Sequence, residues 1–127
     1  MQTTLAPEYK GTPDGDAAEA ILRKCVHCGF CTATCPTYQL LGDELDGPRG
    51  RIYLIKQVLE GEKPTRATQL HLDRCLTCRN CESTCPSGVI TAAAVSSQEL
   101  SIPRITIRPP STHCPHSTGS DIESHGF

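Results

Sequence analysis

Two cysteine-rich runs with the same spacing constrain the fold of this 127-residue chain more than any other feature. The first run, CVHCGFCTATCP, occupies residues 25–36, and the second, CLTCRNCESTCP, occupies residues 75–86. Both follow the pattern C-x2-C-x2-C-x3-C-P, so the chain contains an internal repeat with an offset of 50 residues. Eight of the nine cysteines lie in this repeat. The fold must therefore bring together two sets of closely spaced thiols.

Large apolar side chains are scarce in this sequence. Aromatic residues make up 4% of the chain, and tryptophan is absent. A small domain with so few of them commonly depends on metal ions or disulfides for part of its stability. The N-terminal segment lacks a basic stretch followed by an apolar one, so we expect no secretory signal and a cytoplasmic location. Thiols stay reduced there and bind metals rather than pairing as disulfides.

Charge and hydropathy argue against two classes of interaction. The formal net charge is −2, with 12 basic and 14 acidic residues, so we expect no surface for nucleic acid. The sequence has no run of about 18 apolar residues, so we expect no transmembrane segment. Motifs for flavin, nicotinamide or phosphate binding are also missing from the sequence, and we predict no catalytic residue.

Helical signals precede and follow each cysteine run. Asp16, with Glu19 three residues later, predicts a helix start that leads into Cys25. A short helix is predicted after Pro36, with its end at Gly42.

Two further helices are predicted between the runs. Pro48 suits a first helical position and Gly61 a stop, and Pro64 can begin another helix that ends near Cys75. The residues expected to face inward from these two helices are Ile52, Ile55, Val58, Leu59, Ala67 and Leu70.

These signals predict an all-α domain over residues 14–95, because no strand pattern accompanies the helices. The first cysteine motif with its helices spans residues 14–46, and the second spans residues 66–95. Residues 1–13 are polar and contain two prolines, so we expect a loose arm. Prolines also interrupt residues 96–127, which we expect to form an irregular or disordered tail.

The spacing of the cysteines is typical of [4Fe–4S] clusters, in which each of four irons takes one thiolate. In bacterial ferredoxins that carry this run, the fourth cysteine ligates the other cluster. The following proline turns the chain away, so the fourth thiolate reaches a neighbouring cluster more easily than its own. We therefore predict two [4Fe–4S] clusters with ligands that cross between the runs. The first cluster is assigned to Cys25, Cys28, Cys31 and Cys85, and the second to Cys75, Cys78, Cys81 and Cys35.

Three other uses of the thiols are less consistent with the sequence. Zinc sites normally have well-separated ligand pairs, whereas here three cysteines fall within seven residues. A disulfide framework requires an oxidising compartment. Buried structural thiols would have to share one spacing twice by coincidence.

Several residues near the cysteine runs or in the tail have more than one interpretation. His27 either tunes a cluster or is an exposed loop residue. Arg49 and Arg51 either stabilise a reduced cluster, pair with carboxylates of a partner, or form a solvated helix end. Cys114 lies between His113 and His116 in the tail, where we expect a free thiol rather than a metal site.

The helical linker between the runs resembles the α-helical ferredoxin fold found in the iron–sulfur subunits of fumarate and succinate oxidoreductases. The segments CVHCGFCTATCPTYQLLGDELDGPRGRIYLIKQVLEG and HLDRCLTCRNCESTCPSGV are similar to the iron–sulfur subunits of bacterial glycolate oxidases, also called glycolate dehydrogenases. The similarity covers residues 20–89. The linker sequence distinguishes this family from other iron–sulfur proteins better than the cysteine spacing does. The spacing alone indicates only a broad class of iron–sulfur proteins.

This resemblance implies a subunit that carries electrons without a substrate site of its own. Flavoprotein subunits of the same complex would oxidise glycolate to glyoxylate, and this chain would pass the electrons toward a respiratory acceptor. The complex would lie at the cytoplasmic face of the inner membrane. Related subunits serve lactate and glycerol-3-phosphate dehydrogenases, so these are alternatives, and a zinc-binding interaction module is a remote one.

The resemblance stops near Val89, whereas the family continues into a further cysteine-rich region. The composition changes directly after this point. We therefore expect a truncated or frameshifted product, and a fragment unable to assemble is a further alternative.

Overall fold

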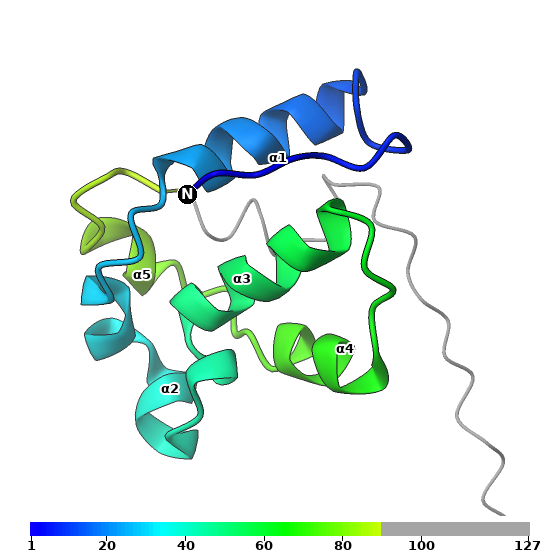
Figure 1. Cartoon of the computed structure of the whole chain (residues 1–127). Coiled ribbons are helices and arrows are strands. Elements are labelled where there is room, and N and C mark those ends of the chain that lie inside the picture. Colours follow the sequence, from blue (N-terminus) through cyan, green and yellow to red (C-terminus); the bar gives the residue numbers. More distant parts are fainter. Residues whose placement is uncertain (90–127) are drawn as a thin grey trace, which may run out of the picture.

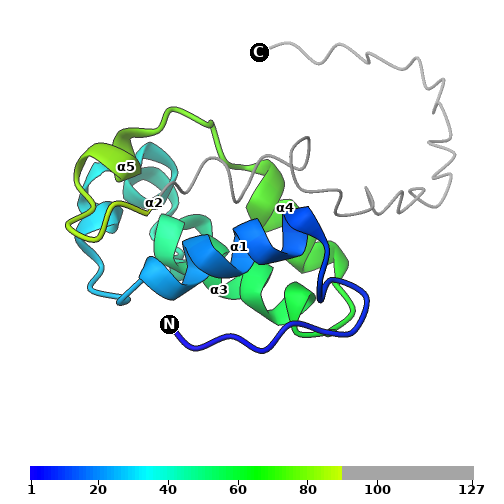
Figure 2. The same ribbon diagram turned by 90° about the horizontal axis from the view of Figure 1, so that it is seen from above.

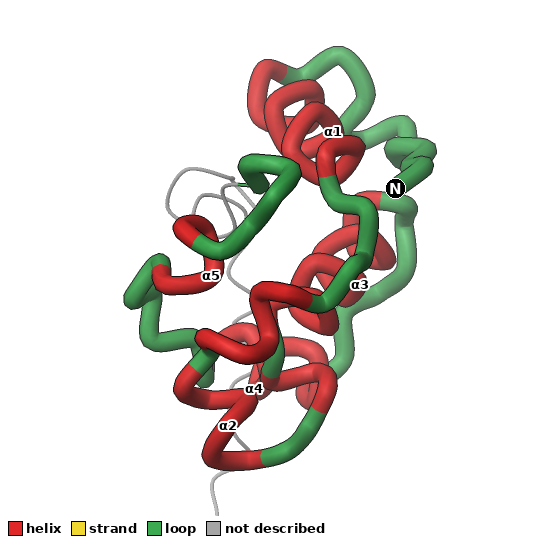
Figure 3. Tube along the Cα trace, turned by 90° about the vertical axis from the view of Figure 1, so that its left-hand side faces the viewer, coloured by secondary structure: helices red, strands yellow, loops and turns green. Residues whose placement is uncertain are grey.

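The computed structural model describes residues 1–89, which form five α-helices and two 3-10 helices within and around the cysteine runs (Figure 1). No strand occurs among these residues, as Figure 3 shows, which confirms the all-α prediction for the described part of the chain. The expected tail at residues 96–127, with Cys114, lies outside the described residues, as does the end of the predicted domain at 90–95. The elements are α1 (Pro13–Lys24), η1 (Phe30–Thr34), α2 (Pro36–Leu41), η2 (Glu44–Asp46), α3 (Pro48–Leu59), α4 (Arg66–Asp73) and α5 (Asn80–Ser83).

The internal repeat of the sequence is also a repeat of structure. Helix α1 precedes the first cysteine run as α4 precedes the second, and the helical turn η1 matches α5 within the runs. Element η1 packs against α5, and the two appear side by side in Figure 1. At this contact the hydroxyl oxygens of Thr34 and Thr84, which occupy equivalent positions of the repeat, are 2.9 Å apart. The two halves of the domain therefore meet at their corresponding residues.

Helix α1 begins earlier than predicted. Thr12, rather than Asp16, is the N-cap, and its side chain accepts a hydrogen bond from the backbone N–H of Gly15. Pro13 takes the first helical position, where its missing N–H costs nothing. Asp16 instead lies in the first turn, where its negative charge interacts favourably with the positive end of the helix dipole. The capping-box prediction was wrong because a threonine followed by proline offers a better start.

The segment before α1 is not the loose arm predicted from its composition. It runs back alongside α1 (Figure 1), and Leu5 is only 9% exposed within the hydrophobic core. The backbone N–H of Ala6 donates to the carbonyl of Leu59 at 2.8 Å, and the amino group of Met1 donates to the carbonyl of Cys25 at 2.6 Å. Leu5, together with Met1 and Tyr9 at its sides and a few backbone hydrogen bonds, holds this arm against the core, and a count of polar residues does not reveal these contacts.

The core lies between α1 and α3, which pack together and cross in the view of Figure 2. The predicted inward-facing residues of α3 are buried, and each stabilises the fold by roughly 1.5–3 kcal/mol relative to exposure. The core continues to the thiol of Cys25 and to the partly buried Cys85, so apolar packing positions both runs. The buried core residues are Leu5, Ala18, Leu22, Cys25, Ile52, Ile55, Leu59 and Val89.

Helix α4 differs from its prediction in both start and orientation. It begins at Arg66, with Thr65 and Thr68 forming a capping box, rather than at Pro64. Ala67 is exposed and Leu70 is 48% exposed, so neither faces inward as predicted. Instead, Leu72 packs against the core. In so short a helix, two apolar residues do not determine which face is buried. Here the buried face is set by Leu72 and by the hydrogen bonds of His71 and Arg74 to Asp46.

Candidate metal centres

The eight cysteines of the repeat line two cavities, and each cavity takes cysteines from both runs. The first, which we call the Cys35 cavity, is lined by Cys35, Cys75, Cys78 and Cys81. The second, the Cys85 cavity, is lined by Cys25, Cys28, Cys31, Cys81 and Cys85. They enclose about 410 and 370 Å³ of empty space, open mouths included. Among the described residues, all eight cysteines are free thiols, so they form no disulfide framework.

The fourth cysteine of each run thus lies apart from the cavity lined by the first three. Cys35 is buried and lines the cavity of the second run, whereas Cys85 lines the cavity of the first. Cys81 lines both cavities and so lies in the wall between them. The geometry brings together every thiol that the sequence placed in each set, with Cys81 touching the other set as well.

Both cysteine loops share an unusual backbone conformation. His27 and Thr77, at equivalent positions of the repeat, have φ values of 58° and 52°. Gly29 and its equivalent Arg79 have φ values of 85° and 62°. Within residues 1–89, the non-glycine residues with positive φ all lie in these loops. Each such residue costs on the order of 1–3 kcal/mol, and strain of this kind persists where a functional site requires the loop shape.

The thiols differ in how readily they ionise. Burial raises the pKa of Cys31 to about 11, with a further contribution from the nearby Cys81. Burial alone would also raise the pKa of Cys35, but the Thr37 hydroxyl, the backbone N–H of Tyr38 and the charge of Arg51 lower it overall. Because metals bind thiolates, ligation at Cys31 must displace a proton, whereas Cys35 is better prepared to serve as a ligand.

His27 contacts a thiol rather than pointing freely into solvent. Its Nδ1 is 3.2 Å from the sulfur of Cys25, within hydrogen-bonding distance. Burial, followed by the positive charge of Arg49, holds the pKa of His27 below its usual value. The second run has Thr77 at this position, so the two cavities differ here.

Arg51 is a buried cation and not the solvated helix end considered from the sequence. Its side chain is 1% exposed, whereas that of Arg49 is 36% exposed. Nε of Arg51 donates to the carbonyl of His71 at 2.7 Å, and Nη1 donates to the hydroxyl of Thr37 at 3.1 Å and to the sulfur of Cys35 at 3.9 Å. Nη2 is buried without a hydrogen-bond partner among the described residues. Arg51 itself lines the Cys35 cavity.

Gly50 permits this placement of Arg51. A Cβ at this position would collide with the backbone of Glu44 and Leu45, so only glycine lets α3 approach η2 this closely. The close approach brings Arg51 beside Asp46, with Nη2 of the arginine 3.8 Å from the carboxylate.

Asp46 is buried and connects η2 to α4, a role that the sequence did not indicate. Its carboxylate accepts hydrogen bonds from Nδ1 of His71 at 3.0 Å and from Nη1 of Arg74 at 2.9 Å. Burial alone would raise the pKa of Asp46, but these hydrogen bonds outweigh it and hold the pKa below its ordinary value. The only sequence signal was an acidic residue in a polar turn, which usually indicates exposure.

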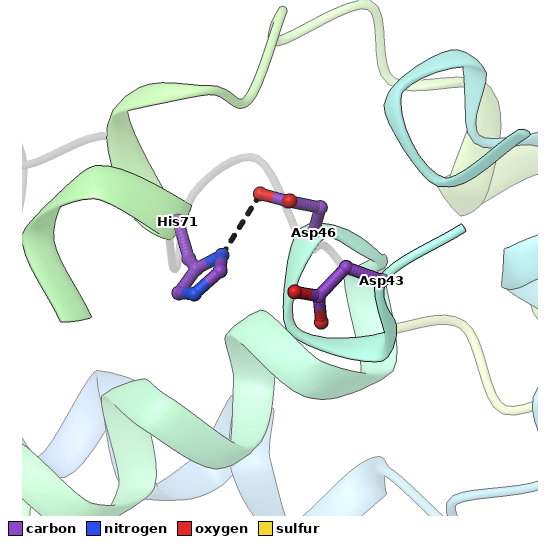
Figure 4. A group of neighbouring side chains, drawn as sticks. All are labelled: Asp43, Asp46 and His71. Atoms are coloured by element: carbon purple, nitrogen blue, oxygen red, sulfur yellow. Dashed lines mark hydrogen bonds and ion pairs between the residues drawn. The ribbon is translucent and has the colours of Figure 1, made fainter. Parts of the chain in front are cut away.

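Asp43, Asp46 and His71 lie close enough to suggest a separate cation site (Figure 4). Asp46, however, already contacts His71 and Arg74 and lies near Arg51. Asp43 accepts a hydrogen bond from the backbone N–H of Leu45 at 2.9 Å. The group is therefore an ion-pair network, in which two guanidinium groups would repel a metal ion.

A family model described as "4Fe-4S dicluster domain" matches residues 21–89. The chain belongs to this family. The dicluster domain, with its eight cysteines, implies two [4Fe–4S] clusters, in agreement with the sequence prediction.

Two curated proteins are similar to this dicluster domain. The glycolate oxidase iron-sulfur subunit of Escherichia coli (strain K12) is 75% identical over 89 residues, which are 70% of this chain and 22% of that protein. The probable glycolate oxidase iron-sulfur subunit of Bacillus subtilis (strain 168) is 50% identical over 44 residues, which are 34% of this chain and 10% of that protein. The chain therefore spans less than a quarter of the length of either relative.

The residues of the dicluster domain fit such clusters chemically. Each cavity offers at least four thiols, which is the number of ligands that a [4Fe–4S] cluster takes. The unpartnered Nη2 of Arg51 belongs to a side chain that lines the Cys35 cavity, where a negatively charged group would satisfy it. Within residues 1–89, none of the helices has the length and apolar character needed to cross a membrane.

Proposed function

We propose that this chain is the cluster-binding part of the iron–sulfur subunit of a glycolate oxidase and relays single electrons within that complex. The observation that carries the proposal is the arrangement of eight thiols around two adjacent cavities in a dicluster domain. The similarity to the Escherichia coli protein supports the choice of complex.

The proposed ligand sets cross between the runs, in a domain that extends from residue 14 to residue 95. The linings of the two cavities support this assignment, because Cys35 lies with the second run and Cys85 with the first. Cys81 is assigned to the Cys35 cavity, since the first three cysteines of a run of this type serve one cluster. The ligands are thus Cys25, Cys28, Cys31 and Cys85 for one cluster, and Cys75, Cys78, Cys81 and Cys35 for the other.

The protein's own contribution is to hold and orient these ligands. When bound, [4Fe–4S] clusters supply one-electron redox chemistry. The left-handed residues of each loop fix the shape of the run, and the Thr34–Thr84 contact joins the two runs. Because Cys81 lies in the wall between the cavities, the two sites are neighbours and an electron has a short distance to cross.

The proposed partners are the flavoprotein subunits of the same complex. Oxidation of glycolate to glyoxylate releases two electrons and two protons to a flavin, which can pass the electrons on singly. This chain would take each electron and transfer it toward a respiratory acceptor at the cytoplasmic face of the inner membrane. Complexes that oxidise lactate or glycerol-3-phosphate remain the second candidates, because a shared cluster scaffold does not determine the substrate.

Two measurements test the proposal. Anaerobically purified chain should be brown and contain about eight irons and eight acid-labile sulfides. A colourless protein with about two zinc ions would contradict the cluster chemistry. Loaded chain should then bind the flavoprotein subunits in a pull-down and be reduced when glycolate, but not lactate, is added. Loaded chain that fails to bind them would contradict the proposed partners alone.

A further inference from the structure

The two cavities are alike in thiols but differ in buried charge. Three arginines line them, and two of these are partly exposed and paired with carboxylates. Arg49 at the Cys85 cavity pairs with Glu44, and Arg79 at the Cys35 cavity is 65% exposed and pairs with Glu82. Such pairs contribute little, because solvent and the carboxylate offset their field. With one pair at each cavity, they do not distinguish the two sites.

Arg51 is the remaining arginine, and it lines only the Cys35 cavity. Because its side chain is 1% exposed, solvent screens its charge weakly. Its Nη1 also lies within hydrogen-bonding distance of the Cys35 sulfur, at 3.9 Å. Net charge and hydrogen bonds to sulfur are two of the factors that set the potential of a cluster.

Asp46 offsets the charge of Arg51 only in part. Its two carboxylate oxygens accept hydrogen bonds from His71 of α4 at 3.0 Å and from Arg74, the residue after α4, at 2.9 Å. Nη2 of Arg51 is farther away, at 3.8 Å, and has no hydrogen-bond partner among the described residues. Arg51 and Arg74 thus share a single carboxylate, so the network of these three residues keeps a net positive charge beside the Cys35 cavity.

We propose that Arg51 raises the reduction potential at the Cys35 cavity above that at the Cys85 cavity. The inference rests on the proposed clusters and their ligand sets. One-electron reduction adds a negative charge to a cluster, and a buried guanidinium beside its ligand favours that form. An electron supplied by a one-electron donor, such as a reduced flavin, therefore comes to rest beside Arg51.

The test is a redox titration of the loaded full chain, followed by electron paramagnetic resonance. A pH of about 8 keeps His27 uncharged. The wild-type chain should show two clusters with different midpoint potentials. Arg51→Gln should lower the higher potential, with at least a tenfold change in the reduction equilibrium, which is about 59 mV for one electron. The lower midpoint potential should shift by less than the higher one.

Two further variants keep the test decisive if Arg51→Gln loads poorly. Arg74→Gln removes a half-exposed cation and leaves Asp46 free to offset Arg51, so the same higher potential should fall by a smaller amount. Arg49→Gln is the matched control at the Cys85 cavity, and it should shift neither potential as far as Arg51→Gln does. When only Arg74→Gln loads, its shift must exceed that of Arg49→Gln and fall on the higher potential.

The outcomes separate this inference from the proposed function. A chain without iron and labile sulfide would contradict the cluster chemistry before any titration. A chain that loads two clusters but keeps its higher potential in Arg51→Gln would overturn the role of Arg51 alone. A shift confined to the lower potential, or equal shifts in both, would overturn it as well.

Discussion

Asp46 and Arg51 form a buried pair of opposite charges that joins three elements. Asp46 lies in η2 and Arg51 in α3, while His71 and Arg74 reach Asp46 from α4 and the residue after it. A buried ion network of this kind gives little net stability compared with an apolar equivalent, but breaking it leaves an uncompensated charge. Its value here is to fix the position of Arg51 and of the chain leading to Cys75.

Asp46→Asn should destabilise the domain by about 3–5 kcal/mol, because it leaves a buried guanidinium without its carboxylate. The measurement is anaerobic guanidinium unfolding followed by helical circular dichroism. Glu19→Gln is the control, since it removes an exposed ion pair with Arg23 and should cost less than about 0.5 kcal/mol. Equal costs for the two variants would show that the network carries no buried charge.

Cys35→Ser tests the crossing of the ligand sets. Cys35 belongs to the first run but lines the cavity of the second, so the cluster of the second run should be lost or altered. Iron analysis should fall toward about half of the wild-type value, and one of two spin signals should disappear. Cys114→Ser, outside both runs, should retain all the iron. Damage confined to the cluster of the first run would refute the crossed assignment.

At the residue scale, the sequence indicated the cysteines that line the cavities but not the charged residues around them. The eight cysteines stand out because four thiols at a fixed spacing, repeated, have few chemical uses. Asp46 was missed and Arg51 was open to a solvated interpretation, because a charged residue in a Gly- and Pro-rich turn is usually exposed. Their burial depends on contacts with His71 and Arg74, which lie 20 to 28 residues further along the chain, and no local pattern contains that information.

At the scale of elements, the ends of α2 and α3 that are marked by proline and glycine were predicted well, whereas the helix start predicted at Pro64 was wrong. Helix α3 runs from Pro48 to Leu59 and α2 ends before Gly42, as their signals indicated. The orientation of α4 was not predicted, because a helix of eight residues has too few apolar positions to define a face. The N-terminal arm was also wrongly predicted, since it is anchored by a few scattered apolar side chains such as Leu5 and by backbone groups that any sequence possesses.

Leu5→Ala tests whether the arm before α1 belongs to the folded domain. Leu5 is buried against the core, so its truncation should cost about 2–5 kcal/mol and increase hydrogen exchange at Ala6, whose N–H is bonded to Leu59. The control is Leu40→Ala on α2, where the side chain is 85% exposed and the cost should be less than about 0.5 kcal/mol. Equal stability of the two variants would show that the arm is a loose segment, as its composition suggests, and not part of the folded domain.

For the whole molecule, the clusters should act as part of the core. The apolar cluster between α1 and α3 ends at Cys25 and Cys85, and beyond it η1 packs against α5 within the cysteine runs. Removal of the clusters by an oxidant and a chelator should therefore lower the helical circular dichroism and broaden thermal unfolding. Reconstitution with iron and sulfide should restore both, whereas zinc should not. Unchanged helicity and cooperativity after removal would mean that packing alone holds the fold.

The wall that Cys81 shares between the two cavities has a consequence for how the chain acquires its cofactors. Filling either cavity requires cysteines from both runs and so fixes the loops that line the other. The loops of the second site are then already ordered, so the second cluster binds without the entropic cost of ordering them. Loading should therefore be cooperative. When iron and sulfide are supplied for only half the sites, native mass spectrometry should show more empty and fully loaded chains than independent filling gives. During maturation of such a domain, chains with both clusters would accumulate rather than chains with one.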